Sequence, residues 1–138
     1  AQRMQEEILK RWNEVDYLFM SAAVSDFTPV KSENKKIKKK KELTISLKKN
    51  IDILLDLKNR KSNQIIVGFS LDTDNQISEA KIKLNEKGID LMIANDLSAI
   101  GSNSTSGFLL SKEGEEQFEC SKDELSWKII EKISSKKR

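Results

Sequence analysis

The hydrophobic positions of the chain follow two spacings, which predict two kinds of element. Apolar side chains recur every three or four residues along residues 2–12, which predicts an amphipathic helix. The same spacing predicts a helix from about residue 74 to Lys87 and another after Ser121. Continuous apolar runs instead predict buried strands at residues 15–20, 64–70 and 89–94. Helices and strands therefore alternate, and the pattern predicts an α/β fold.

The second half of the chain is the most regular part of this pattern. The helix that ends near Lys87 is followed by Gly88, a residue suited to the left-handed end of a helix. A buried strand lies before this helix and another after it, which predicts two parallel strands joined by a right-handed crossover. Two short strands at residues 107–111 and 117–120 should follow. Ser121 and Glu124 predict a capping box for the last helix, whose expected buried face is Leu125, Ile129, Ile130 and Ile133.

A period of two appears where the chain is richest in lysine. Leu43, Ile45 and Leu47 alternate with polar residues, which predicts one limb of a β-arm. Lys36–Lys39 would form the other limb, with a loop near Lys40 and Lys41. A two-stranded ribbon is only marginally stable alone, so we expect the apolar side chains of the arm to pack on a second subunit.

Two segments next to this arm are suited to a ligand. Residues 21–25 have small side chains, typical both of tight packing and of close approach to a ligand, and Asp26 follows at the expected carboxyl end of a strand. Asn50 is a predicted N-cap for a helix over residues 51–57, whose free N–H groups could hold phosphate. Asp52 in the first turn would repel phosphate unless a Mg²⁺ ion lies between them.

The composition narrows the possible chemistry. The 138 residues predict one domain, and no apolar run approaches the roughly 20 residues that span a bilayer. The chain contains no histidine, which excludes Ser-His-Asp and Cys-His catalysis and a Cys/His zinc site. Cys120 is the single cysteine, so no internal disulfide can form, and we expect a cytoplasmic protein with no membrane partner.

The net charge of +3 hides a strong local excess of lysine. Lysines gather at positions 31, 35, 36, 38, 39, 40, 41, 48 and 49. A solvated loop, a nucleic-acid surface and a site for a phosphorylated small molecule all fit this pattern. Since no aromatic residue interleaves the lysines to stack on bases, a small-molecule phosphate is favoured over nucleic acid. Lys83 and Lys87, four residues apart, more commonly form a solvated face than an anion site.

Five segments together resemble the phosphopantothenate–cysteine ligase family, also called phosphopantothenoylcysteine synthetase. They are AAVSDF at Ala22–Phe27, KIKKK at Lys36–Lys40, ELTISLKKNIDIL at Glu42–Leu54, GFS at Gly68–Ser70 and KGIDLMIAND at Lys87–Asp96. The resemblance implies a Rossmann-like, three-layer fold with a mostly parallel sheet, and a homodimer whose protruding β-arms cross between subunits. It also implies amide formation between 4′-phosphopantothenate and cysteine, using Mg²⁺ and CTP, with ATP as the alternative nucleotide, on the route to coenzyme A.

The resemblance also implies site residues. The implied nucleotide-binding set is Met20, Ser21, Ala22, Asp26, Lys36, Ile51, Asp52, Ile53, Leu54, Phe69, Lys83 and Lys87. Lys36 is the implied catalytic residue, acting on the activated carboxylate from the arm of the partner subunit. Asp26 is the implied metal ligand. No residue is identified as the base for attack by the cysteine amine.

The chain departs from the family pattern in two respects. Ile51 stands where the family usually has a proline. The N-terminal half of the family domain, with its glycine-rich turn, is absent, so we expect residues 1–138 to be the C-terminal portion of a ligase domain and to have little activity alone. A nucleic-acid-binding module that uses Lys35–Lys41, and a non-catalytic subunit of the same fold, remain the alternative functions.

Overall fold

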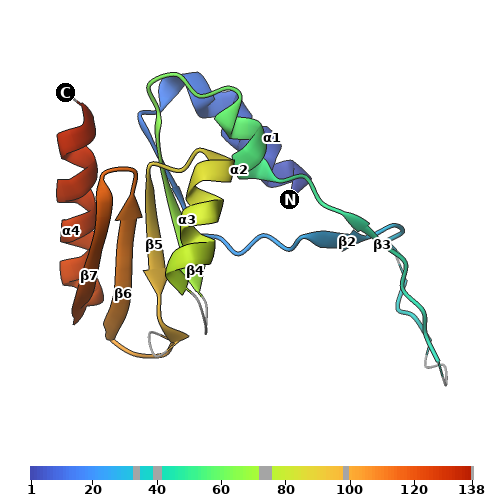
Figure 1. The fold of residues 1–138 in the computed structure, drawn as a ribbon. Helices are drawn as coiled ribbons and strands as arrows, with labels where there is room; N and C mark the ends of the chain where they lie inside the picture. Colours follow the sequence, from blue (N-terminus) through green and yellow to red (C-terminus); the bar gives the residue numbers. More distant parts are fainter. Residues whose placement is uncertain (33–34, 39–41, 72–75, 98–99, 138) are drawn as a thin grey trace.

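The computed structural model describes residues 1–32, 35–38, 42–71, 76–97 and 100–137 of the chain (Figure 1). Its helices are α1 (Gln2–Arg11), α2 (Ile53–Lys58), α3 (Gln76–Lys87) and α4 (Lys122–Ser134), with 3-10 turns at Trp12–Glu14 and Ser135–Lys137. Its strands are β1 (Tyr17–Met20), β2 (Phe27–Pro29), β3 (Leu47–Lys49), β4 (Ile65–Leu71), β5 (Leu91–Asn95), β6 (Ser104–Ser111) and β7 (Gly114–Ser121).

Five of these strands form one sheet, in the order β1-β4-β5-β6-β7. β4 pairs in parallel with both β1 and β5, while β6 runs antiparallel to both β5 and β7. Four of the five strands therefore point in one direction, which confirms the predicted α/β fold with a mostly parallel sheet. β6 begins at Ser104 rather than at residue 107, and β7 begins at Gly114 rather than at residue 117.

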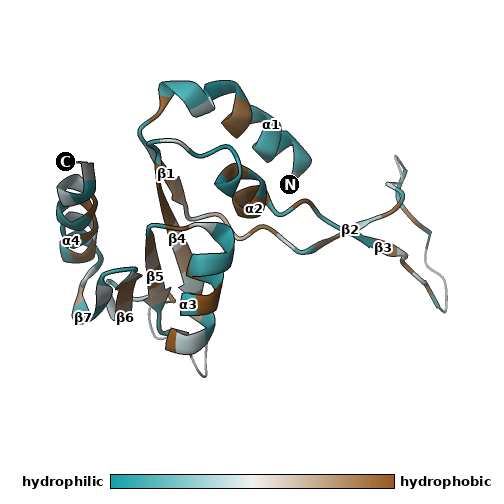
Figure 2. Cartoon of the chain, turned by 45° about the horizontal axis from the view of Figure 1, so that its top comes forward, coloured by the Kyte–Doolittle hydropathy of each residue, from teal (hydrophilic) through white to brown (hydrophobic). Residues whose placement is uncertain are grey.

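Helices cover both faces of this sheet and give three layers (Figure 1). Ile66 and Met92 lie in the core beneath α1, α2 and α3, whereas Val67 and Ile93 lie in the core beneath α4. Neighbouring residues of one strand thus enter opposite cores, as the alternation of side chains in a strand requires. Figure 2 shows hydrophobic residues concentrated on β1, β4 and β5. Strands buried on both faces read as continuous apolar runs, which is why the sequence revealed them.

The predicted faces of the outer helices are confirmed with one exception. Trp12, just after α1, is buried, and its Nε1 donates to the carbonyl oxygen of Arg60 at 3.1 Å. Ser121 and Glu124 form the predicted capping box at the start of α4. Ile130 was predicted to be buried but is 44% exposed, since it lies at the edge of the α4 contact with the sheet. No helix in the described ranges is both long and apolar enough to cross a bilayer.

The protruding arm, which we define as residues 27–49, is present but paired differently from the prediction. β2 pairs antiparallel with β3, with Phe27 opposite Lys49 and Pro29 opposite Leu47. The limb predicted at Lys36–Lys39 is wrong for residues 36–38, which form no strand; residue 39 and the predicted loop at residues 40–41 lie outside the described residues. We call the remainder of the chain the body. The described residues of the arm pair as strands only next to the body, since nothing in the described part of the chain covers the ribbon farther out.

The helix after the arm also begins later than predicted. Asp52, not Asn50, is the N-cap of α2, and its side chain accepts a hydrogen bond from the backbone N–H of Leu55 at 3.1 Å. Asn50 is used elsewhere: its backbone N–H donates to the carbonyl oxygen of Asp26, and its Nδ2 donates to that of Ser25, both at 2.7 Å. Either residue could cap a helix, but the hydrogen bonds to Ser25 and Asp26 engage Asn50 and leave Asp52 as the cap.

Candidate functional site: a cavity at the carboxyl ends of β1 and β4

A cavity of about 480 Å³ lies where the body meets the arm. Met20 at the end of β1 and residues 68–71 of β4 form its floor, so it lies at the carboxyl ends of two parallel strands. Open α/β sheets commonly bind ligands in this position. Residues 22–26, residues 49–54 and two lysines of α3 complete its walls.

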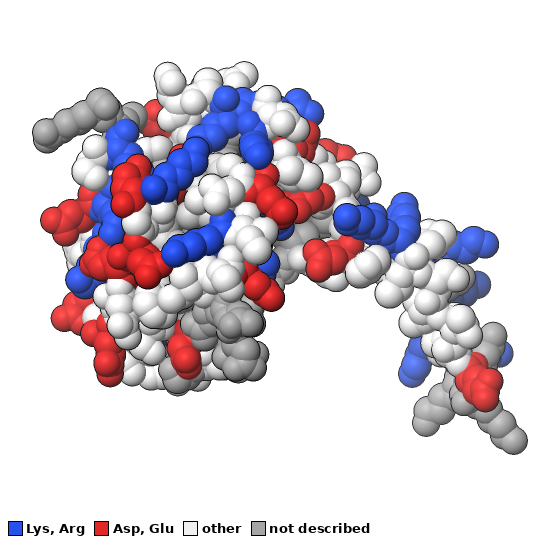
Figure 3. Space-filling model, in the orientation of Figure 1, with Lys and Arg blue, Asp and Glu red and all other residues white. Residues whose placement is uncertain are grey.

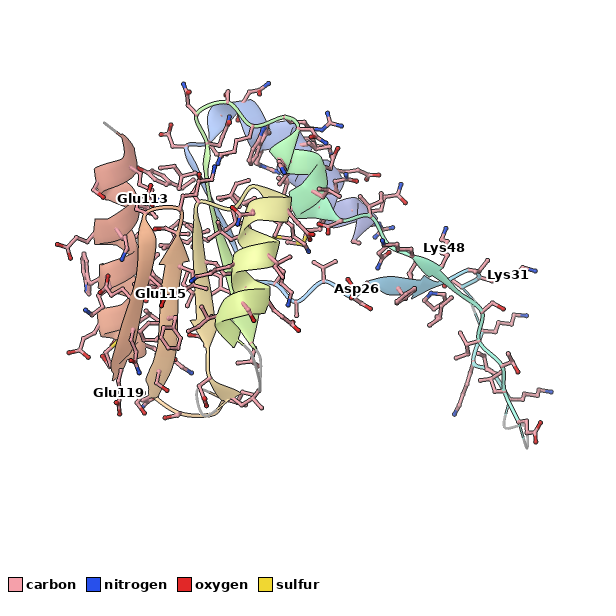
Figure 4. All side chains as sticks on the ribbon, in the orientation of Figure 1. Asp26, Lys31, Lys48, Glu113, Glu115 and Glu119 are labelled. Atoms are coloured by element: carbon pink, nitrogen blue, oxygen red, sulfur yellow. The ribbon has the colours of Figure 1, made fainter. Side chains whose placement is uncertain are left out.

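The wall formed by residues 22–26 consists mainly of small side chains, so a ligand can approach its backbone closely. Hydrogen bonds hold this wall in place: Ser25 Oγ donates to the carbonyl oxygen of Phe27 at 3.0 Å, in addition to the two bonds from Asn50. Figure 4 shows Asp26 at the junction of body and arm, with Lys48 and Lys31 farther out. The arm is thus attached directly to one wall of the cavity.

Two of the lysines that line the cavity lie close to carboxylates, which offset part of their positive charge. Lys87 Nζ lies 3.0 Å from Asp52 Oδ2, an ion pair that joins the end of α3 to the start of α2. Burial acts to raise the pKa of Asp52, but hydrogen bonds from Lys87 and from the N–H groups of Leu55 and Leu54 outweigh it and leave this pKa below its ordinary value. Lys83 Nζ lies 3.7 Å from Glu79 Oε2. The repulsion between the two lysines is therefore offset by two carboxylates.

The structure brings most of the predicted nucleotide-binding residues together here. The members that line the cavity are Met20, Ala22, Asp26, Ile51, Asp52, Ile53, Leu54, Phe69, Lys83 and Lys87. Ser21 belongs to the same turn but does not line the cavity. Lys36 lies on the arm, is exposed and does not line the cavity of its own chain.

Other lining residues were not predicted as part of the site. Lys49, Ser70 and Leu71 line the cavity, as do Ile89 and Met92. The last two belong to an apolar run that predicts core, and they are indeed buried, so their pattern carried no sign of a second role. Lys49 was hidden among eight other lysines of the arm region. Only its place at the base of the arm distinguishes it.

A second hollow, of about 450 Å³, lies on the α4 side of the sheet. It shares Phe69 and Leu71 with the first cavity, but Lys122 is its single charged lining residue and most of its other walls are apolar. The α3-side cavity instead combines three lysines with two aspartates. A polyanion could contact three lysine side chains on the α3 side but one on the α4 side, which makes the α3-side cavity the candidate site.

The α3-side cavity could accommodate a hard cation only together with an anionic ligand. No group of three or more acidic or cysteine side chains suited to a metal occurs in the described part of the chain. Asp52 is engaged by Lys87 and by Leu55, which leaves Asp26 as the available carboxylate of the cavity. Mg²⁺ commonly binds one or two carboxylates plus phosphate oxygens and water, and Asp26 fits that donor set.

Two curated proteins and one solved structure are similar to this chain over most of its length. A coenzyme A biosynthesis bifunctional protein CoaBC from Borreliella burgdorferi is 37% identical over 135 residues, covering 94% of this chain and 35% of that protein. A cysteine/cysteine sulfinic acid decarboxylase from an unknown prokaryotic organism is 39% identical over 104 residues, covering 74% of this chain and 29% of that protein. A crystal structure of the C-terminal domain of a CoaBC protein superposes with a TM-score of 0.76 at 29% identity, covering 96% of this chain and 60% of that one.

These matches, together with a family model, identify the family of the chain. The chain spans about a third of the length of the curated relatives it matches. The family model described as the DNA/pantothenate metabolism flavoprotein C-terminal domain matches residues 1–136, which is nearly the whole sequence. The solved domain reproduces the same α/β fold over almost all of the chain. The chain therefore belongs to the DNA/pantothenate metabolism flavoprotein C-terminal domain family.

Proposed function

We propose that this chain is the phosphopantothenate–cysteine ligase portion of a coenzyme A biosynthesis protein. The observation that carries the proposal is the gathering of ten of the twelve predicted nucleotide-binding residues around one cavity at the carboxyl ends of β1 and β4. The similarity to CoaBC proteins over nearly the whole chain supports the same function. The substrates would be 4′-phosphopantothenate, cysteine and CTP, with ATP as the alternative nucleotide, and the enzyme would act in the cytoplasm.

The charges of the cavity suit the first step of such a reaction. A carboxylate is a poor electrophile, and transfer of a nucleotide to it creates a leaving group while pyrophosphate departs. Negative charge then gathers on phosphate oxygens, and fixed cations stabilise it; one well-placed donor is worth about 3 kcal/mol. Lys83 and Lys87 line the cavity and would serve this role, while the small residues 22–25 would allow the nucleotide to contact the backbone.

Magnesium would bind at Asp26 together with the phosphate oxygens. When bound, the ion supplies positive charge that offsets the developing charge on those oxygens. The residues of this chain hold Asp26 in place, because Asn50 donates to the carbonyl oxygens of both Asp26 and Ser25. Substitution of Asp26 by Asn should therefore weaken the magnesium dependence of nucleotide binding.

The arm would complete the site of a second subunit. Lys36 does not line the cavity of its own chain, and the arm carries exposed apolar residues that include Leu43 and Ile45, at 54% and 57%. In a homodimer, those side chains would be buried, and Lys36 would be supplied to the partner's activated carboxylate. The proposed active site therefore depends on two chains.

The direct test is amide formation by the protein expressed from its complete gene. We expect product from 4′-phosphopantothenate and cysteine with CTP and Mg²⁺, measured by mass spectrometry and pyrophosphate release.

The role of the arm is tested by substitution of Lys36. Lys36→Gln should reduce turnover by at least about 100-fold while leaving the melting temperature unchanged. A mixed dimer of Lys36→Gln and Lys87→Gln chains should regain activity, because one of its two sites would hold both lysines. Absence of nucleotide-dependent amide formation would refute the function, and normal turnover of the Lys36→Gln protein would refute the role of the arm.

A further inference from the structure

Lys49 differs from the other lysines that line the cavity. Lys87 is paired with Asp52, and Lys83 lies near Glu79. Lys49 also lines the cavity, but it forms no ion pair with any carboxylate in the described ranges. A paired lysine must exchange its carboxylate for an incoming phosphate, whereas an unpaired one loses no ion pair.

The backbone fixes the direction of Lys49. Lys49 is opposite Phe27 in the β2–β3 ribbon, and the next residue, Asn50, is bound to the carbonyl oxygens of Ser25 and Asp26. Pairing on one side and two hydrogen bonds on the other therefore hold the peptide that carries Lys49. Because side chains alternate along a strand, Lys48 faces away and does not line the cavity.

The charge distribution supports an anion in this place. Figure 3 shows mostly basic side chains along the arm, with acidic atoms near its outer end, whereas acidic and basic side chains intermix throughout the visible face of the body. The lining of the cavity carries three lysines against Asp26 and Asp52, and Lys49 supplies the excess positive charge. Lys49 lines the cavity from the base of the arm, whereas Lys83 and Lys87 line it from α3, so that a polyphosphate in the cavity would meet cations from two separate elements.

We propose that Lys49 is a further binding residue of this cavity, contacting the phosphate oxygens of the nucleoside triphosphate from the base of the arm. The inference rests on the proposed function for the identity of the nucleotide, and on the geometry of the cavity for the position of the lysine. It assigns the arm two roles: its outer part would act on a partner, and its base contributes to the cavity of its own chain.

The test compares two neighbouring lysines. Lys49→Gln and Lys48→Gln remove the same charge from adjacent positions of β3, but only the first changes the cavity. CTP and inorganic triphosphate should be titrated calorimetrically into the protein expressed from its complete gene, at low and high salt. We expect Lys49→Gln to raise the dissociation constant for both probes about tenfold at low salt, with a weaker salt dependence, and Lys48→Gln to change it less than twofold. Unchanged melting temperatures would show that both variants fold.

The outcomes separate this inference from the proposed function. If Lys87→Gln weakens CTP binding while Lys49→Gln behaves like Lys48→Gln, the role of Lys49 is overturned and the proposed function stands. If inorganic triphosphate binds and Lys49→Gln weakens it, but CTP and ATP bind no better than the inorganic probe, Lys49 is an anion-binding residue and the proposed function fails. If neither probe binds, both are overturned.

Discussion

In the body of the protein Ile66 is fully buried, whereas in the arm Ile45 keeps 57% of its surface exposed. Both are isoleucines in segments of apolar and polar residues, but Ile66 lies in a strand paired on both sides and covered by helices. Ile45 lies in no strand, and the arm that carries it extends away from the layers of the body (Figure 1). The same side chain therefore stabilises the fold of one chain in the body and is available to another molecule in the arm.

The hydrogen bonds of the two regions differ in the same way. The strands of the body pair along their length, with eight residue pairs between β6 and β7. Among its described residues, the arm has three pairs between β2 and β3 and one further backbone hydrogen bond, from the N–H of Val30 to the carbonyl oxygen of Ser46 at 2.9 Å. An arm with so few internal contacts gains order chiefly from what it contacts, so it is suited to reach a partner.

The largest expected effect concerns burial. Ile66→Ala should lower the free energy of unfolding by about 3 kcal/mol, because it removes buried methyl groups and leaves a cavity. Ile45→Ala should change it by less than about 0.5 kcal/mol at a concentration where the protein is monomeric, since its side chain is exposed there. Urea unfolding followed by circular dichroism would measure both. Equal losses would mean that the arm is packed within its own chain.

An intermediate effect is expected on association. Ile45→Ser should weaken self-association at least about tenfold, because the proposed dimer buries this side chain. Thr44→Ser is the matched control, since it lies next to Ile45 and changes one exposed side chain only slightly. Sedimentation velocity over a range of concentrations would measure the shift. A monomeric wild-type protein, or one whose association Ile45→Ser leaves unchanged, would contradict burial of the arm.

The smallest expected effect concerns the junction of the two regions. The pKa of Asp52 is lower in the folded protein than in the unfolded chain, so its ion pair with Lys87 stabilises the fold above about pH 4 and is lost as the pH falls below that. Asp52→Asn keeps the N-cap of α2 but cannot ionise, so the decrease in stability below pH 4 should become shallower. Asp52→Ala should also lose the cap, at a cost of about 1 kcal/mol. Thermal melts between pH 3 and pH 7 would measure both effects. If the melting temperature of Asp52→Asn falls with decreasing pH as steeply as that of the wild type, ionisation of Asp52 does not contribute to the pH dependence of stability.

The regular elements of the body could be predicted because local patterns and tertiary contacts agree there. Gly88 ends α3 with a φ of +64°, as its position after a helical pattern predicts. The strand β6 was only partly predicted, because residues 104–106 are small and polar and gain their strand conformation from pairing with β7. Gly107 sits in that strand without a side chain because an added Cβ would lie 2.0 Å from the carbonyl oxygen of Ala94.

The helix start after the arm could not be predicted in the same way. Asn50 and Asp52 are both good N-caps, and the prediction of Asn50 was wrong because Asp52 caps α2. The choice depends on Ser25 and Asp26, which are distant in sequence and accept the hydrogen bonds of Asn50. The role of Lys49 was hidden for a related reason, since nothing in a run of lysines distinguishes the one that faces a cavity.

The sequence by itself determined the α/β class, the two buried strands β4 and β5, the C-terminal end of α3 and the start of α4, because each depends on the period of apolar residues or on a cap within one turn. The predicted start of α3, at about residue 74, lies outside the described residues. Tertiary structure alone decided the order of the strands, the late start of α2 and the extent of the arm. It also decided which lysines line the cavity. These features depend on contacts between residues that belong to different elements of the chain, such as Asn50 with Ser25 and Asp26, and no local pattern records which of these groups will meet.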